Sequence, residues 1–98
     1  MTVRHVSLLT WGVGTTDEQI AAVVDALRRL PRAIPEIRAY AVRTDMGLKD
    51  GNAHMAIMAD FDDVAGYRAY AEHPAHLRVL TEVIRPILAG RSAIQFEA

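Results

Sequence analysis

Four histidines and three tyrosines are the residues of this chain best suited to proton transfer: His5, His54, His73, His76, Tyr40, Tyr67 and Tyr70. An imidazole titrates near neutral pH, so it can take a proton from a carbon acid and return one to a carbonyl oxygen. A tyrosine hydroxyl can donate a hydrogen bond to the enolate oxygen that develops. Pro74 separates Tyr70 from His76, and a bend at this proline would turn both side chains into one cavity.

Each histidine also has a structural explanation that requires no function. His76 follows the proline that begins a predicted helix, where a local hydrogen bond would account for it. His5 lies in a predicted strand, and a buried histidine is more often a hydrogen-bonded core residue than a catalyst. We expect His54 at a strand end facing water, and His73 as the cap of the helix that starts at Pro74. Both interpretations stay open for these residues.

Metal and cofactor motifs are weak in this sequence. His73 and His76 have the i, i+3 spacing of helical metal ligands, but no third ligand lies at a supporting spacing and cysteine is absent. Gly12 and Gly14 precede a predicted helix, yet the third glycine of a dinucleotide-binding loop is missing. We therefore expect neither a metal ion nor an organic cofactor.

The composition indicates a soluble protein with a large apolar surface to cover. Of 98 residues, 51% are hydrophobic, while the net charge is only −1. No charge excess favours nucleic acid or anionic lipid, and no apolar stretch reaches the roughly 20 residues of a membrane span. We expect one cytoplasmic domain over residues 1–98 that binds neither nucleic acid nor membranes. The apolar surplus suggests a partner subunit or a ligand cavity.

The first half of the chain predicts a strand, a helix and a second strand. Residues 3–11 are rich in strand-forming types and are partly apolar on both faces. Thr16 and Gln19 have the spacing of a capping box at a helix start. Pro31 is expected to end this helix, and residues 37–44 form the next strand. The helix presents one apolar stripe, made of Ile20, Val23, Val24, Leu27 and Leu30.

The second half predicts two strands and two helices. A loop over residues 45–52 precedes a strand over 53–61. Asp62 or Asp63 caps a helix that runs to about residue 71, and a second helix runs from Pro74 to about residue 83. Pro86 and Gly90 are expected to stop it before a final strand over residues 93–96.

The order of elements, β-α-β-β-α-α-β, predicts an α+β sandwich. Helices on one side of a four-stranded sheet leave its other face without cover. Since the first strand is apolar on both faces, we expect a second copy of the same sheet to cover that face through an isologous interface. The sequence thus predicts a homodimer.

Three segments resemble a known family. They are the strand that carries His5, the proline turns at Pro31 and Pro35, and the segment from Tyr70 to His76. Together they resemble the stress-responsive A/B barrel (Dabb) family over essentially the whole chain. The resemblance implies a ferredoxin-like fold, a homodimer that forms a dimeric α+β barrel, and a cavity between sheet and helices in each subunit.

The resemblance also implies a site. The segments are similar to those of polyketide cyclases of the olivetolic acid cyclase type, in which an acid–base pair corresponds to Tyr70 and His76 here. The pocket histidines correspond to His5, in the first strand, and His54, in the third. Aromatic residues of the first helix are replaced by smaller ones, which changes the pocket wall. The expected substrate-binding residues are His54, Val23, Val24, Leu27, Ala56 and Met58.

Three functions are compatible with this sequence. One is a cofactor-free lyase or cyclase acting on a small apolar carbonyl or phenolic compound, with His76 as base, Tyr70 as proton donor and His5 beside them. A second is a small-molecule-binding or stress-protection module without turnover. A third is a cofactor-free monooxygenase. All three need a dry cavity with a few polar groups, so the sequence leaves the choice open.

Overall fold

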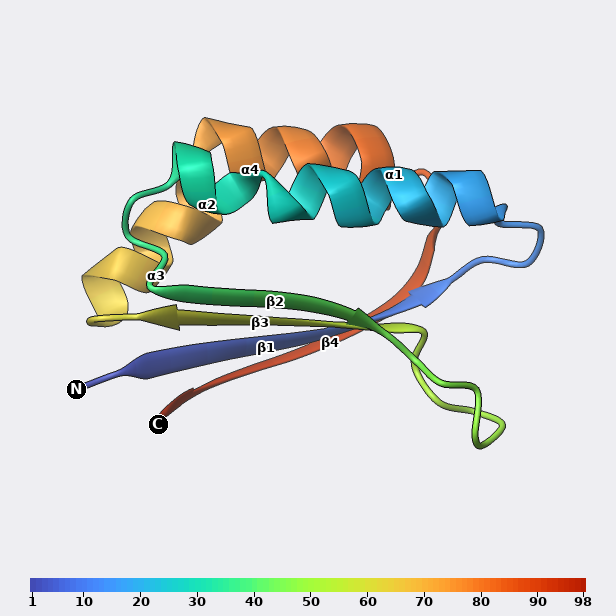
Figure 1. The fold of residues 1–98 in the computed structure, drawn as a ribbon, viewed down its shortest axis with the longest axis horizontal. Coiled ribbons are helices and arrows are strands. Elements are labelled where there is room, and N and C mark those ends of the chain that lie inside the picture. Colours follow the sequence, from blue (N-terminus) through green and yellow to red (C-terminus); the bar gives the residue numbers. More distant parts are fainter.

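Four antiparallel strands form a single sheet in the order β2-β3-β1-β4. The computed structural model describes residues 1–98, and Figure 1 shows the sheet as one layer with every helix on the same side. The central strand β1 pairs with β3 on one side and β4 on the other. The strands are β1 (Val3–Trp11), β2 (Ala39–Thr44), β3 (Met55–Phe61) and β4 (Leu88–Glu97).

The helical layer begins with a helix whose start was predicted from the sequence. Thr16 and Gln19 form the expected capping box in front of α1. Asp63 accepts a hydrogen bond from the Gly66 N–H at the start of α3, and His73 accepts one from the Ala75 N–H at the start of α4. The helical elements are α1 (Asp17–Arg28), α2 (Leu30–Ala33), α3 (Val64–Glu72), α4 (Pro74–Val79) and the π-helix η1 (Leu80–Ile84).

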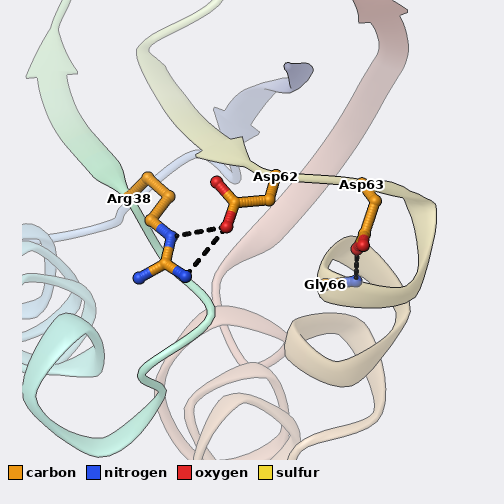
Figure 2. Close-up of polar contacts among 4 residues, drawn as sticks. All are labelled: Arg38, Asp62, Asp63 and Gly66. Carbon is orange, nitrogen blue, oxygen red and sulfur yellow. Dashed lines mark hydrogen bonds and ion pairs between the residues drawn. The ribbon is translucent and has the colours of Figure 1, made fainter. Parts of the chain in front are cut away.

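A polar contact fixes the chain where β3 passes into α3. Figure 2 shows Arg38, just before β2, donating two hydrogen bonds to a single carboxylate oxygen of Asp62, at 2.9 and 3.1 Å. The neighbouring Asp63 turns the other way and caps α3 through Gly66 at 2.8 Å. Because Asp62 and Asp63 adjoin β3, these contacts tie the first turn of α3 to the edge of the sheet.

Several predicted boundaries are corrected by the structure. Pro31 does not end α1, which stops at Arg28; it lies in the first turn of α2, where its missing N–H costs no hydrogen bond. Gly90 does not separate helix from strand, because it lies inside β4 and pairs with Thr10 of β1. That strand is therefore ten residues long, not the four expected. His54 precedes β3 and does not belong to it.

The hydrophobic core lies between the helices and the inner face of the sheet. Its sheet side consists of alternate residues of β1 and β3, among them Leu9, Met55 and Ile57. Val23 and Leu27 of α1 pack against them as the predicted stripe. No helix in the structure is long and apolar enough to cross a membrane.

The outer face of the sheet has no helix over it and carries exposed apolar side chains. Val6 lies opposite Met58 on one side and Ile94 on the other, and Met58 and Ile94 are 39% and 59% exposed. Leu8 and Phe96 continue this apolar surface, and both are exposed. We call the five residues Val6, Leu8, Met58, Ile94 and Phe96 the outer patch.

Candidate functional site

A cavity of about 340 Å³ lies between the inner face of the sheet and the helical layer. Three strands and three helical elements contribute apolar walls, including Leu9, Leu27, Ile57, Leu80, Ile84 and Leu88. Polar groups enter from β1, α3 and α4, and their rings lie close together. The mixture of apolar walls and a few converging polar groups is typical of a small-molecule site.

His5 lies on the inner face of β1 and is 4% exposed. The Gln95 amide nitrogen is a donor and lies 2.9 Å from His5 Nδ1, so Nδ1 accepts and the proton of the neutral ring is on Nε2. Burial, with smaller effects from the charges of Arg91 and His76, lowers the pKa of His5 to about 4. At neutral pH His5 is therefore an uncharged hydrogen-bond donor.

His76 has the opposite tautomer. Its Nδ1 lies 3.1 Å from the backbone carbonyl oxygen of Ala71, which can only accept, so the proton is on Nδ1. The Nε2 lone pair is left free to act as a base. Burial lowers the pKa of His76, which keeps the ring neutral at pH 7, although the hydrogen bond to Ala71 opposes this effect. The break between α3 and α4 makes this contact, because Ala71 lies in the last turn of one helix and His76 in the first turns of the next.

Tyr70 presents its ring to the cavity from the buried side of α3. Its hydroxyl lies 3.0 Å from the hydroxyl of Tyr40, on the inner face of β2. Tyr70 lines the cavity, whereas Tyr40 does not. When the Tyr40 hydroxyl donates to the Tyr70 oxygen, the Tyr70 hydroxyl is free to donate its own proton to a ligand in the cavity. Burial raises the pKa of both hydroxyls, and both stay protonated at neutral pH.

The ring of Tyr70 lies close to the rings of both His5 and His76. The ring centroids of Tyr70 and His76 are 4.3 Å apart, and those of His5 and Tyr70 are 6.1 Å apart. Tyr67 closes the group, with its ring centroid 5.3 Å from that of His5. A free base and two donors thus surround one volume, which is the arrangement required for moving a proton to or from a carbonyl compound.

Two arginines also line this cavity and were not singled out from the sequence. Arg91, on β4, lies opposite Leu9 of β1, and Arg85 follows the end of η1. The ion pairs of the chain involve other arginines, so neither of these two has an acidic partner. A longer predicted final strand would have placed Arg91 on the inner face, two residues from Ala93.

The structure distributes the expected substrate-binding residues over several places. Leu27 lines the cavity, whereas Val23 is fully buried in the core behind it and Val24 is half-buried; neither reaches the cavity. Ala56 and Met58 lie on the outer face, because the inner-facing residues of β3 are their neighbours Met55, Ile57 and Ala59. The expectation that Ala56 and Met58 line the pocket is thus corrected by the pairing of the strands.

His54 lies at the far end of the sheet, outside this cavity. Its Nδ1 accepts a hydrogen bond of 2.9 Å from the backbone N–H of Trp11, and its own backbone N–H donates to Leu9. The ring borders a separate hollow beside Gly12 and Asp45. His54 therefore extends the pairing of β1 and β3 beyond the end of the strand.

His73 faces the backbone of α4 as its cap, and no group of three or more histidines and carboxylates is placed to hold a metal ion. His73 thus caps a helix whereas His76 lines the cavity, although only two residues lie between them. The pair does not converge on a common point in the cavity, since His76 lines it and His73 does not.

Comparison with known proteins identifies relatives across nearly the whole chain. The model of the stress responsive A/B barrel domain matches residues 3–98. A protein of Streptomyces coelicolor is 32% identical over 76 residues, which cover 76% of this chain and 78% of that protein.

Among solved structures, a dimeric ferredoxin-like protein of unknown function from Thermobifida fusca is 44% identical. It superposes with a TM-score of 0.92, over 100% of this chain and 92% of that one. The hydroxynitrile lyase from Passiflora edulis has a TM-score of 0.85 at 19% identity, over 97% of this chain and 91% of that one. The fold is thus ferredoxin-like, as the order of elements and the resemblance led us to expect.

Proposed function

Because the chain belongs to the stress-responsive A/B barrel domain family, we propose that it is a homodimer whose cavities perform cofactor-free acid–base chemistry. The substrate in this proposal is a small apolar carbonyl or phenolic compound, and the reaction is of the lyase or cyclase type. The observation that carries the proposal is the convergence of His5, Tyr70 and His76 on one cavity, with complementary tautomers of the two histidines.

The proposed assembly rests on the outer patch. Its apolar residues form a continuous surface on a sheet face that no helix covers, and exposed apolar surface of this kind is typical of an interface. The related Thermobifida fusca protein is dimeric. A second copy placed face to face would bury both patches and leave the cavities, on the other side of each sheet, accessible.

The proposed reaction begins with proton removal from the carbon next to the substrate carbonyl. His76 Nε2 takes the proton, the electron pair of the broken C–H bond forms the enolate double bond, and the carbonyl oxygen gains the negative charge. The Tyr70 hydroxyl and His5 Nε2–H would donate hydrogen bonds to that oxygen. Reversal of the same transfers returns the proton, so no cofactor is needed. The hydroxynitrile lyase from Passiflora edulis has the same fold, so this fold can carry a lyase.

Proton exchange tests the proposal without knowledge of the natural substrate. Acetophenone has exchangeable methyl protons next to a carbonyl, and its loss of proton NMR signal in D₂O reports abstraction directly. We expect the protein to accelerate this exchange and His76→Gln to slow it by about a hundredfold, the usual contribution of a general base. Binding of acetophenone should change by less than about threefold, because a base acts chiefly in the transition state.

The matched control is His73→Asn, which removes the neighbouring imidazole but keeps an acceptor suited to the helix cap. Exchange should be unchanged in this variant. If the unmodified protein binds acetophenone but does not accelerate exchange, the acid–base function is refuted and a binding or stress-protection module becomes the better explanation. Oxygen-dependent consumption of a phenolic compound would instead support the monooxygenase.

A further inference from the structure

The charged groups that line the cavity are all cationic. Arg85 and Arg91 contribute guanidinium groups, whereas no aspartate or glutamate is among the lining residues. His5 and His76 are held neutral at pH 7 by burial, so they do not add to or offset this charge. The cavity therefore carries net positive charge in a chain whose overall net charge is −1.

Arg91 is positioned by the sheet. It pairs with Leu9 in the β1–β4 register, and paired residues in antiparallel strands project on the same face, so Arg91 shares the inner face with Leu9 and His5. Arg91 lines the same cavity as His5, Tyr70 and His76. Its positive charge contributes to the lowered pKa of both histidines.

Arg85 has a partial structural explanation that Arg91 lacks. It caps the C-terminal end of η1, where a positive charge interacts favourably with the exposed carbonyl groups. Arg91 lies in the middle of a strand, and none of the ion pairs of the chain includes it. An unpaired guanidinium beside an apolar cavity is suited to an anion, and its planar fork matches the two oxygens of a carboxylate.

We propose that the cavity takes a carboxylate-bearing ligand whose anionic group pairs with Arg91, with Arg85 adding a weaker attraction at the rim. This inference rests on the proposed function for the other end of the ligand, where the reacting carbonyl lies between Tyr70 and His76. Leu27, Ile57 and Leu80 contact its apolar body. The substrate class is thus narrowed from small apolar carbonyl or phenolic compounds to small keto acids with an apolar body.

A pair of probes of equal shape isolates the charge. 4-Acetylbenzoate and 4-acetylbenzamide differ chiefly in their charge, and calorimetric titration of the full chain measures the affinity for each. We expect the carboxylate to bind at least tenfold more tightly than the amide, and the preference to decrease as salt is raised. Arg91→Gln should abolish the preference by weakening carboxylate binding while leaving amide binding unchanged, and Arg91→Lys should restore part of it.

Two further variants separate a specific site from general electrostatics. Arg85→Gln should reduce the preference by about twofold to threefold. Arg68→Gln removes an exposed arginine of α3 that does not line the cavity, and it should leave both affinities unchanged. Equal binding of the two probes by the unmodified protein, or an equal loss of carboxylate affinity in Arg68→Gln and Arg91→Gln, would overturn the proposal. Failure to bind either probe at millimolar concentration would overturn it as well.

The test also separates this inference from the acid–base function. His76→Gln leaves Arg91 in place, so it should keep the preference for the carboxylate even though it loses proton exchange. A preference for the carboxylate without proton exchange would support the anion site and refute the catalytic role. Proton exchange without any preference for the carboxylate would support the catalytic role and refute the anion site.

Discussion

Both faces of the strand β1 carry residues that depart from the usual distribution of buried apolar and exposed polar side chains. On the inner face of β1, His5 and Ser7 are buried polar residues, 4% and 3% exposed. Their neighbour Leu8, on the outer face of the same strand, is 41% exposed. A protein that functioned alone and without a ligand would gain stability from the opposite arrangement. This arrangement agrees with the proposed function, in which the inner face carries the chemistry and the outer face associates with a second subunit.

The two faces also differ in how their polar groups are satisfied. Inside, a hydrogen bond with another element orients each histidine: Gln95 donates to His5, and His76 donates to the backbone carbonyl of Ala71. Outside, an ion pair between Arg4 and Asp60 lies at one end of the outer patch. Because that pair bridges β1 and β3 within one subunit, it leaves the centre of the patch wholly apolar.

The largest expected effect is on the outer face. Val6→Glu places a carboxylate between Met58 and Ile94, at the centre of the outer patch. Burying this charge without a partner in a dimer interface costs several kcal/mol, so the dimer should dissociate at micromolar concentration. Light scattering should then give the subunit mass of 10.8 kDa in place of twice that value.

Val13→Glu is the matched control for this change, because Val13 is fully exposed in the turn after β1. It should leave the mass of the dimer unaltered. A dimer that persists in Val6→Glu, or an unmodified protein with the mass of one subunit, would refute association through this face.

The next largest effect is the loss of stability in acid that the buried His5 on the inner face causes. The pKa of His5 is about 4 in the folded protein against 6.5 for an unperturbed histidine, so the unfolded chain binds this proton more readily. The contribution of His5 to stability should therefore fall as pH decreases from about 6.5 to about 4 and change no further below that. The difference between the two pKa values corresponds to about 3 kcal/mol. Urea unfolding at fixed protein concentration, repeated across this range, measures the loss.

His5→Gln should remove most of this acid sensitivity, although His76 will still contribute, because burial lowers its pKa in the same sense. His54→Asn is the comparison, since His54 is exposed and asparagine can accept the Trp11 hydrogen bond in its place. This variant should lose stability in acid as the unmodified protein does. An unchanged acid profile in His5→Gln would contradict the neutral, buried state of that ring.

The sequence predicted more of the framework than of the site. The limits of β1, the capping box at Thr16 and the cap at His73 depend on local spacing, and the structure confirms them. The face to which a residue of β3 points depends on its pairing with β1, which the sequence alone does not specify. Alternation grouped Ala56 and Met58 correctly with each other but could not say that their face is the outer one.

The residues of the site that the sequence did not reveal were missed for the same reason, because their positions depend on pairing between distant segments. Arg91 remained unnoticed because Gly90 suggested a break, whereas nine residues of β1 pair with β4 and carry the strand through this glycine. The sequence did not connect Tyr40 with the site, because its contact with Tyr70 joins positions thirty residues apart. The roles of Tyr70 and His76 as an acid–base pair, with His5 beside them, were implied by the resemblance to a family, because local periodicity does not report which elements meet at a cavity.

The smallest expected effect compares two hydroxyls of one hydrogen bond. Tyr40→Phe and Tyr70→Phe each remove the same contact of 3.0 Å and leave one hydroxyl unpaired. Both variants should therefore lose a similar free energy of unfolding, about 1 to 2 kcal/mol. Only Tyr70 lines the cavity, so Tyr70→Phe should slow proton exchange of acetophenone about tenfold, as expected when a donor to the enolate oxygen is lost. Tyr40→Phe should slow it about twofold, since it changes only the orientation of the Tyr70 hydroxyl. Equal rates in the two variants, at equal stability, would assign both tyrosines to the structure and leave His5 as the donor to the enolate oxygen.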